Sequence, residues 1–403
     1  MRDFEVPTWQ IDPNTLPPLL MTSEPDSFAF RSFKYRIPTI VEETIRLNRF
    51  PEDIRRALEA LRGEILEGKI RGLQEETVDR IFWDEVSRPY LGRSWFEVPW
   101  YWAEAFFYRR ILEATRYFQP GAWQGFDPYQ AKKQTEWRPE AAPQLVNALL
   151  MQLPEAPEAR FEALVYASLW GNRVDLSYDA VAHVGRASRL DDVRDSLLVD
   201  DTPRVWDYLT REVRHRLALV ADNAGTELLM DLALADFLLD QGLVEQVVFH
   251  LKPQPFYVSD AMPADVQAGL AALPAGGPLA AALSQRLRQY LREGRLVLES
   301  HWLYATSLFY CQLPDDLRSR LAEMDLVILK GDVNYRRTVI DVHWPPTTPY
   351  AQVTAYFPTV PVNLRTLKGE LIVGLKEGQA ERLYGEDPDW LVNGRRGVIQ
   401  ARL

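Results

Sequence analysis

A strand–turn–helix segment at residues 217–241 places the strongest constraint on how this chain can fold. It begins with five apolar residues, LALVA (217–221), a run of the kind that fills a buried parallel strand. Asp222 and Asn223 then open a polar turn, after which the chain becomes strongly apolar again over a helical length. Strand, polar turn and helix form the unit of an α/β sheet, whose ligands bind beyond the carboxyl ends of the strands. Asp222 and Asn223 are therefore either binding-site residues or ordinary turn residues.

Strand and helix signals keep alternating through the second half of the chain. Residues 244–251 (VEQVVFHL) predict a β-strand, and residues 325–330 (DLVILK) predict a second buried strand. We expect two further strand-like pieces at 352–357 and 371–375, on either side of a cationic turn at 362–369. This alternation predicts an α/β fold, a three-layer α/β/α sandwich with a mainly parallel sheet.

The first part of the chain carries helical patterns instead. Residues 27–48 and 51–67 place apolar residues at helical spacing, and residues 51–67 begin with a proline and two acids, as helices often do. Residues 95–118 are so rich in aromatic side chains that we expect a helix packed on both sides. The sequence therefore predicts an all-helical N-terminal domain.

Residues 119–144 contain four prolines and two glycines, which predicts a loop-like connection between two units. We expect a helical N-terminal domain with an extended arm and this linker over residues 1–145. The α/β/α unit then covers residues 146–403.

Composition excludes several classes of function. Among 403 residues, Lys and Arg number 46 and Asp and Glu number 57, a net charge of −11 that argues against nucleic-acid and anionic-membrane partners. The single cysteine, Cys311, excludes an intramolecular disulfide and a thiolate metal cage. No apolar run reaches the roughly 18 residues of a membrane span, and the first residues lack a signal-peptide pattern. We therefore expect a cytoplasmic protein.

Several common site motifs are absent from the chain. It contains no G-x-G-x-x-G, no G-x-x-x-x-G-K-[ST] and no G-x-S-x-G, which excludes the dinucleotide fingerprint, the P-loop and the nucleophile elbow. The histidines are scattered, which argues against a zinc site: they are His183, His215, His250, His301 and His343.

Carboxylates follow the predicted strands at three turns. Asp222 with Asn223, Asp260 and Asp332 would converge if the strands are parallel neighbours, because the carboxyl ends of such strands meet at one crevice. Oxygen ligands of this kind suit Mg²⁺ or Mn²⁺. Basic residues in or near the same turns make a bound phosphate plausible beside the metal: they are Lys330, Arg336, Arg337, Arg365 and Lys368.

Long motifs now point to a family. Five segments, in order along the chain, resemble the metal-dependent damage-control phosphatases, and in particular their third subfamily, also called the acidic-residue methyltransferase 1 family. They are SLWGNRVDLS (168–177), DNAGTE (222–227), FYVSDA (256–261), KGDVNYR (330–336) and LRTLKGE (364–370). The segments SFAFRSFKYRIPTI and WFEVPWYWAEAFFYRRI near the N-terminus are similar to it as well.

The resemblance implies a set of roles for residues of this chain. A divalent metal ion (Mn²⁺, Ni²⁺, Co²⁺ or Mg²⁺) would be held by Asp222, Asn223 and Asp260. Asp332 would contact substrate rather than serve as a fourth ligand, and Asp222 or Asp332 would be catalytic. The substrate-binding residues implied in this way are Asp222, Asn223, Asp332, Val333, Asn334, Tyr335, Arg336 and Lys368. Other positions near the pocket are Asn172, Asp175, Glu227, Lys330 and Arg365.

The resemblance also implies an activity, the hydrolysis of small sugar phosphates such as fructose 1-phosphate or fructose 6-phosphate in metabolite damage control. A water molecule activated by the metal would attack phosphorus while Lys368 and Arg336, with Lys330 as a further candidate, neutralise the phosphoryl oxygens. A phospho-aspartate on Asp222 or Asp332 stays open as a second route. The sequence leaves the oligomeric state open too.

Two rival hypotheses remain at this point. The family's other name suggests a protein-glutamate O-methyltransferase that uses S-adenosylmethionine, although no glycine-rich loop follows a strand where the nucleotide would sit. Alternatively, the aromatic residues Trp95, Trp100, Tyr101 and Trp102 could form the interaction surface of a non-catalytic binding module.

Overall fold

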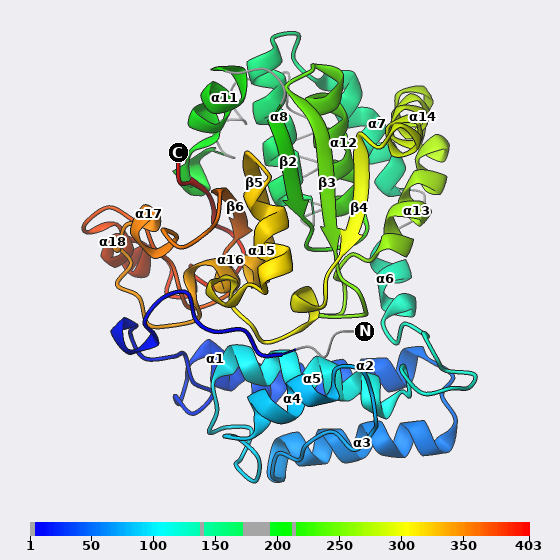
Figure 1. Cartoon of the computed structure of the whole chain (residues 1–403), viewed down its shortest axis with the longest axis vertical. Helices are drawn as coiled ribbons and strands as arrows, with labels where there is room; N and C mark the ends of the chain where they lie inside the picture. Colours follow the sequence, from blue (N-terminus) through cyan, green and yellow to red (C-terminus); the bar gives the residue numbers. More distant parts are fainter. Residues whose placement is uncertain (1–4, 138–140, 172–193, 212–214) are drawn as a thin grey trace.

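A seven-stranded sheet lies at the centre of the computed structural model, which describes residues 5–137, 141–171, 194–211 and 215–403 (Figure 1). Its order is β1-β7-β6-β5-β2-β3-β4, and every neighbouring pair is parallel except β6 and β7. This confirms the predicted α/β class with a mainly parallel sheet. The strands are β1 (Leu197–Asp200), β2 (His215–Val220), β3 (Val244–Leu251), β4 (Leu296–Ser300), β5 (Leu326–Lys330), β6 (Val360–Thr366) and β7 (Gly397–Ala401).

Helices cover both faces of the sheet because successive strand residues point to opposite sides. In β2, Leu217 and Leu219 face one apolar core while Ala218 and Val220 face the other. The second core contains α15 (Asp315–Ala322) and α16 (Gly331–Val339). The first is closed by α7 (Ala141–Gln152), α8 (Pro157–Trp170), α11 (Thr202–Arg211), α12 (Thr226–Asp240), α13 (Pro263–Ala272) and α14 (Pro278–Glu293).

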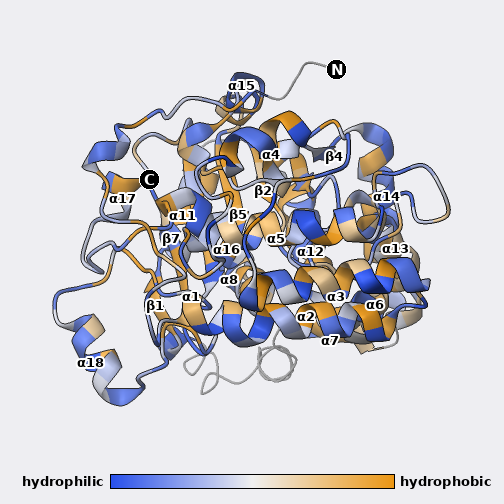
Figure 2. Ribbon diagram, turned by 90° about the horizontal axis from the view of Figure 1, so that it is seen from below, coloured by the Kyte–Doolittle hydropathy of each residue, from blue (hydrophilic) through white to orange (hydrophobic). Residues whose placement is uncertain are grey.

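A layer of N-terminal helices lies across the carboxyl ends of the central strands (Figure 1). Helix α3 buries one face, as predicted, through Ile54, Leu58, Leu61 and Ile65, and α5 is buried along nearly its whole length. In Figure 2, α2 and α3 carry both hydrophilic and hydrophobic residues. The layer contains α1 (Phe28–Arg31), a π-helical turn (Ser32–Arg36), α2 (Ile37–Leu47), α3 (Glu52–Glu67), α4 (Arg80–Ser87) and α5 (Trp100–Ala114).

Two strand predictions near the C-terminus are wrong. Residues 352–357 lie in α17 (Tyr350–Val353) and the turns after it, and residues 371–375 are irregular. In that irregular stretch, the N–H groups of Val373 and Leu375 donate to the Tyr335 hydroxyl and the Pro346 carbonyl, so they join no sheet ladder.

Strand β6 (Val360–Thr366) lies in the region that was predicted as a cationic turn, between the two incorrectly predicted strands. Its polar residues misled the prediction because their partners lie far away in sequence: Asn363 accepts a hydrogen bond from the Tyr350 hydroxyl, and Arg365 donates to Asp332. A buried strand can hold polar side chains when each is hydrogen-bonded.

The predicted linker at 119–144 is also more regular than expected, since it contains α6 (Gln130–Trp137) and the start of α7. The remaining helical pieces are short: α18 (Gln379–Glu386) and the 3₁₀ turns Pro13–Thr15, Leu273–Gly276, Trp302–Ala305 and Tyr310–Gln312. Among the described residues, no helix has both the length and the apolar character needed to cross a membrane.

Candidate active site

The strand order reverses between β2 and β5, and we call the place beyond the carboxyl ends of these two strands the crevice. From β2 the chain crosses to β3 on one side, whereas from β5 it crosses to β6 on the other side, so the direction of winding reverses between these two strands. Ligands of α/β proteins bind at such a point, beyond the carboxyl ends of the strands. Asp222 follows β2 here, and Asp332 lies at the start of α16, directly after β5.

The turns after β2 and β5 touch. Gly331 has a left-handed φ of 85°, and a Cβ atom at this position would lie 2.0 Å from Oδ2 of Asp222. A side chain at 331 would therefore overlap the Asp222 carboxylate, and the φ angle would strain any residue except glycine. The glycine in the KGD motif is required by this close approach.

The turn that carries Asp260 is joined to the same place. The backbone N–H of Ala224 donates to the Ser259 carbonyl (2.7 Å), and the N–H of Ala261 donates to the Asp222 carbonyl (2.8 Å). Just before these residues, Tyr257 and Val258 have φ values of 41° and 68°. Left-handed backbone in such residues costs about 1–3 kcal/mol each and persists where the surrounding structure enforces it, often at functional sites.

The carboxylates of the crevice are crowded with negative charge. Burial raises the pKa of Asp222 well above its usual range, and the neighbouring charges of Glu227 and Asp260 raise it further, while Lys252 and Lys368 act in the opposite direction. Burial also raises the pKa of Asp260, although Lys252 Nζ lies 3.3 Å from its Oδ2 atom. A site that disfavours ionised carboxylates in this way gains free energy by accepting a cation.

Asn223 lies between two of these carboxylates. Its Nδ2 donates to Oδ2 of Asp222 (2.7 Å) and Oε2 of Glu227 (3.0 Å), and its Oδ1 accepts from the Ser259 hydroxyl (2.6 Å). Because the O and N atoms of an amide can be exchanged, the flipped form would present Oδ1 to the carboxylates and still hydrogen-bond Ser259. The donor set of Asp222, Asn223 and Asp260 therefore fits a hard divalent cation.

Lys330 serves as a counter-ion beneath the crevice. Its ammonium lies 3.0 Å from both Glu227 Oε1 and Asp231 Oδ1, and it is almost completely buried. Burial alone would lower the pKa of Lys330, but the two carboxylates outweigh burial and raise it. Despite this pairing, the pKa of Asp231 is raised to about 6, chiefly by burial. The positive charge of Lys330 is thus already paired with Glu227 and Asp231 inside the protein.

Asp332 has a different environment from Asp222. Its Oδ1 accepts from Arg365 Nε (2.7 Å) and from the backbone N–H of Lys368 (3.3 Å). Burial opposes ionisation of Asp332, but the charges of Arg365 and then Arg336 outweigh burial and lower its pKa. The side chain of Lys368 is exposed, whereas the Arg365 guanidinium is buried and is also bound by two carbonyl groups.

The other predicted substrate-binding residues of α16 direct their side chains into the protein. Val333 packs in the apolar core, Asn334 accepts from the Tyr310 hydroxyl (2.7 Å), and the Tyr335 hydroxyl donates to Gln400 (2.9 Å). Arg336 is buried against two carboxylates. What this segment offers a ligand is its backbone, because the first N–H groups of a helix have no acceptor within the helix.

Two of the predicted pocket residues, Asn172 and Asp175, lie outside the described residues. Within the described part of the chain, no three His, Cys, Asp or Glu side chains form a group able to hold a metal ion. The predicted ligand set has only two carboxylates and completes its third place with the amide of Asn223. The sequence analysis did not identify Lys252, whose ammonium contacts Asp260. Its position directly after the buried strand β3 is the signal that could have revealed it.

Fold and crevice together define an α/β protein that gathers acidic groups beyond the carboxyl ends of two neighbouring parallel strands. The model of the damage-control phosphatase ARMT1-like domain matches residues 32–383. The chain belongs to this family, as the sequence motifs predicted. Its members named as phosphatases are hydrolases of phosphate monoesters, so the methyltransferase alternative is not favoured.

Relatives named damage-control phosphatase ARMT1 match nearly end to end. The protein of Danio rerio is 32% identical, covering 96% of this chain and 97% of the relative, and that of Mus musculus is 31% identical, covering 95% and 98%. The human protein is 30% identical, covering 96% and 98%. The crystal structure of a DUF89 family protein from Pyrococcus horikoshii has the same fold, with a TM-score of 0.51 at 16% identity over 92% of this chain and 96% of that one.

Proposed function

We propose that this phosphatase hydrolyses small sugar phosphates of the fructose 1-phosphate and fructose 6-phosphate type, in metabolite damage control, with Mn²⁺, Ni²⁺, Co²⁺ or Mg²⁺ as its metal. The observation that carries the proposal is the crowding of Asp222, Asp260 and Glu227 against the turn after β5. Three acids around one place leave negative charge that a divalent cation would neutralise.

In this proposal Asp222, Asn223 and Asp260 hold the metal, which would act as a Lewis acid on the phosphoryl group and on the attacking water. Glu227 keeps Asn223 in place through the hydrogen bond to its amide. Lys252 balances part of the charge of Asp260 from within the protein.

The phosphate would bind between the first turn of α16 and the side chain of Lys368. The positive charge of Lys368 lowers the pKa of Asp222, and in this proposal the same exposed ammonium attracts an anion bound beside that carboxylate. Asp332, kept ionised by Arg365, can accept a hydrogen bond from the attacking water or from a substrate hydroxyl.

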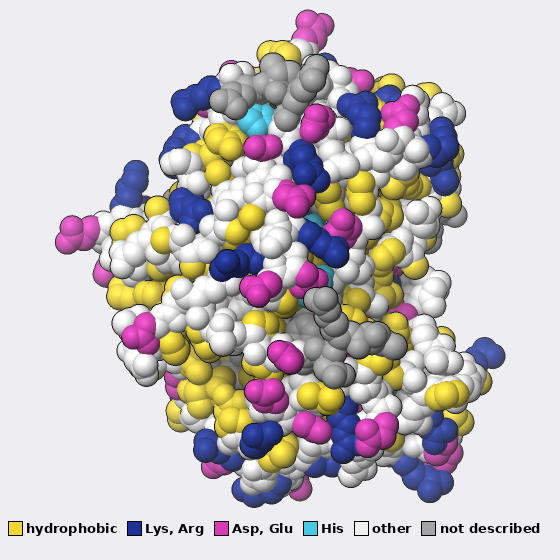
Figure 3. All heavy atoms as spheres, viewed as in Figure 1, with side chains coloured by type: hydrophobic (Ala, Val, Ile, Leu, Met, Phe, Trp, Pro, Cys, Tyr) yellow, Lys and Arg dark blue, Asp and Glu magenta, His cyan; other side chains and the backbone are white. Residues whose placement is uncertain are grey.

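We also propose that residues 1–145 form an N-terminal unit and residues 146–403 the catalytic one. We propose a cytoplasmic location, because a chain with Cys311 alone does not use the disulfides of oxidising compartments. Lys and Arg side chains are interspersed with Asp and Glu side chains on the face seen in Figure 3, which is consistent with a small-molecule partner rather than a nucleic acid.

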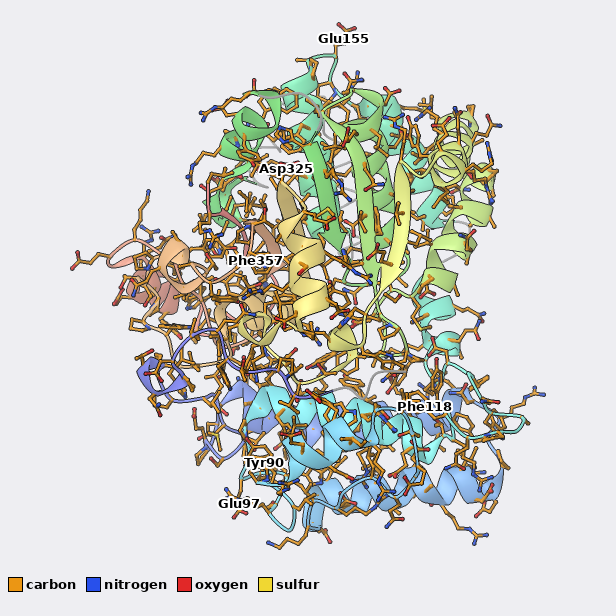
Figure 4. The ribbon with its side chains drawn as sticks, in the orientation of Figure 1. Tyr90, Glu97, Phe118, Glu155, Asp325 and Phe357 are labelled. Carbon is orange, nitrogen blue, oxygen red and sulfur yellow. The ribbon has the colours of Figure 1, made fainter. Side chains whose placement is uncertain are left out.

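The test is an assay of metal-stripped protein for phosphate release from a panel of sugar phosphates, with each of the four metals added back singly. We expect release that depends on metal and is greatest with small ketose phosphates. Asp222→Ala should abolish it, while Asp325→Asn, at the opposite end of β5 (Figure 4), should leave it unchanged. Absence of release with every metal would refute the proposal.

A further inference from the structure

Glu104 of helix α5 lies where the helical layer meets the segments of the proposed active site. Its carboxylate is completely buried, and it accepts hydrogen bonds from three other parts of the chain. Oε2 accepts from Arg336 Nη1 (2.6 Å) and from the Tyr257 hydroxyl (3.4 Å), and Oε1 accepts from Arg36 Nη1 (3.5 Å). One carboxylate thus joins α5 to α16, to the loop before Asp260 and to the N-terminal π-helical turn.

The first of these links holds α16, whose opening turn carries Asp332. Arg336 lies one helical turn after Asp332, and its guanidinium is fixed from several sides. Asp341 binds Nε and Nη2 at 2.8 and 2.9 Å, and the guanidinium stacks over the Trp100 ring at 3.7 Å. Trp100 and Glu104 both belong to α5, so this helix holds α16 in place. We refer to α16 and the Asp260 loop as the two walls of the crevice.

The second link holds the loop that carries Asp260. Tyr257 has a left-handed backbone, and its ring packs on Tyr108 of α5 with the ring centroids 4.6 Å apart. Tyr108 is one helical turn after Glu104, so both side chains lie on the same face of α5. Both contact Tyr257, Glu104 through a hydrogen bond and Tyr108 through its ring. A backbone this unfavourable keeps its shape only while its surroundings enforce it.

We propose that Glu104 is a positioning residue of the phosphatase, through which the helical layer sets the distance between the Asp260 loop and helix α16. The inference rests on the proposed active site. Arg336 on one side and Tyr257 on the other share the Oε2 atom of Glu104, so displacement of one wall is transmitted to the other. The N-terminal layer is then part of the catalytic machinery although it supplies no group to the reaction.

Helix α5 contains a matched control for this role, Glu113. It also forms ion pairs with two arginines, since its Oε2 lies 2.9 Å from Arg71 Nη1 and 3.2 Å from Arg110 Nε, and its Oε1 accepts a hydrogen bond from the backbone N–H of Gln74 at 2.6 Å. None of these partners belongs to the crevice. Glu113→Gln therefore reproduces the loss of a buried ion pair without touching either wall.

The experiment compares Glu104→Gln with Glu113→Gln in the full-length protein. We expect similar falls in melting temperature, but a kcat/KM for fructose 1-phosphate at least tenfold lower in Glu104→Gln, with most of the loss in kcat. We also expect added Mn²⁺ to raise the melting temperature less in Glu104→Gln than in Glu113→Gln. Equal kinetics and equal metal responses in the two variants would overturn the inference.

Two further measurements keep the outcome decisive. Wild-type protein and Asp222→Ala are assayed in parallel, so that an inactive wild type, or an active Asp222→Ala, is recognised as failure of the proposed function itself. If Glu104→Gln does not fold, Tyr257→Phe replaces it, because that change removes one hydroxyl and keeps the ring on Tyr108. A threefold or greater loss of kcat/KM in Tyr257→Phe supports the inference, and an unchanged value overturns it.

Discussion

Two regions of this molecule bury charged groups, and they treat them in opposite ways. In the helical layer every buried arginine is matched by acids: Arg109 binds Asp79 and Glu75, and Arg110 binds Glu64 and Glu113. In the crevice the pairing is incomplete: Lys252 pairs with Asp260 and Lys330 pairs with Glu227 and Asp231, whereas Asp222 forms no ion pair among the described residues.

The pKa shifts express the same contrast. Burial opposes ionisation of Glu113, but a backbone N–H and the charges of Arg71 and Arg110 outweigh burial and lower its pKa. Burial and neighbouring acids together raise the pKa of Asp222. Removing one partner from a matched pair costs stability, whereas an unpaired buried carboxylate already carries a cost that protonation or a bound cation relieves. The difference separates paired from unpaired buried charges in the same protein.

The largest effect that follows from this contrast concerns Asp222→Asn. We expect kcat to fall about ten-thousandfold, equivalent to roughly 5 kcal/mol on the activation barrier. The melting temperature of the metal-free protein should rise, because the raised pKa of Asp222 means that its ionised form destabilises the fold at neutral pH. Steady-state kinetics and thermal unfolding test both parts. A lower melting temperature would show that the Asp222 charge is structurally matched.

The corresponding change in the helical layer is Asp79→Asn. It removes the partner of Arg109 Nε and leaves a buried arginine under-paired, so we expect the free energy of unfolding to fall by about 3 kcal/mol. Activity per folded molecule should stay the same. Urea unfolding measures the first quantity and kcat the second. A large loss of kcat in the folded variant would contradict the division between the two regions.

Gly331→Ala tests the contact between the turns after β2 and β5. The added Cβ would overlap the Asp222 carboxylate, and we expect at least a hundredfold loss of kcat/KM, roughly 3 kcal/mol. Gly378→Ala is the control, because Gly378 has a similar φ of 73° and open space at its Cβ position. It should cost about 1 kcal/mol of stability without loss of activity. Equal activities of Gly331→Ala and Gly378→Ala would show that the turns after β2 and β5 can move apart without loss of function.

Metal addition should distinguish wild type from Asp222→Asn. At a metal concentration about 100 times the dissociation constant, binding adds about 2.7 kcal/mol to the stability of the folded state. We expect thermal unfolding of metal-stripped wild-type protein to shift upward by a few degrees with Mn²⁺, and that of Asp222→Asn not to shift. An equal shift in both would place the metal elsewhere.

Lys368→Met should have the smallest of these effects. The Lys368 side chain is exposed, so its loss should leave the melting temperature unchanged. The KM for a sugar phosphate should rise about tenfold, equivalent to roughly 1.4 kcal/mol of lost phosphate binding. Lys376→Met, at another exposed lysine, serves as the control. An unchanged KM would leave the first turn of α16 as the phosphate site without help from Lys368.

The sequence predicted well those parts of the fold that depend on local pattern. Strands β2, β3 and β5 appear where apolar runs predicted them, and Asp222 and Asp332 follow β2 and β5 as expected. Strand β6 escaped prediction because its residues Asn363 and Arg365 look like solvent-exposed residues. They are buried instead, because their hydrogen-bond partners approach from distant parts of the chain.

The same limit applies to the basic residues near the crevice. Sequence alone grouped Lys330, Arg336, Arg337, Arg365 and Lys368 as cations available to phosphate. The structure pairs Lys330, Arg336 and Arg365 with acids and surrounds the Arg337 guanidinium with two carbonyl groups and the Tyr101 hydroxyl, so of these five side chains only that of Lys368 is exposed. A count of charges cannot reveal this, because the partner of a charge is set by packing and not by neighbours in sequence.

By itself, then, the sequence determined the α/β class, the strand ends that carry the acids and the family, because hydrophobic periodicity and motif spacing are local properties. Only the tertiary structure decided which charges are paired and which are not. The clearest case is Glu104, 232 residues from Arg336 along the chain and 2.6 Å from it in space. Their contact exists because the helical layer packs across the strand ends, which no local pattern encodes.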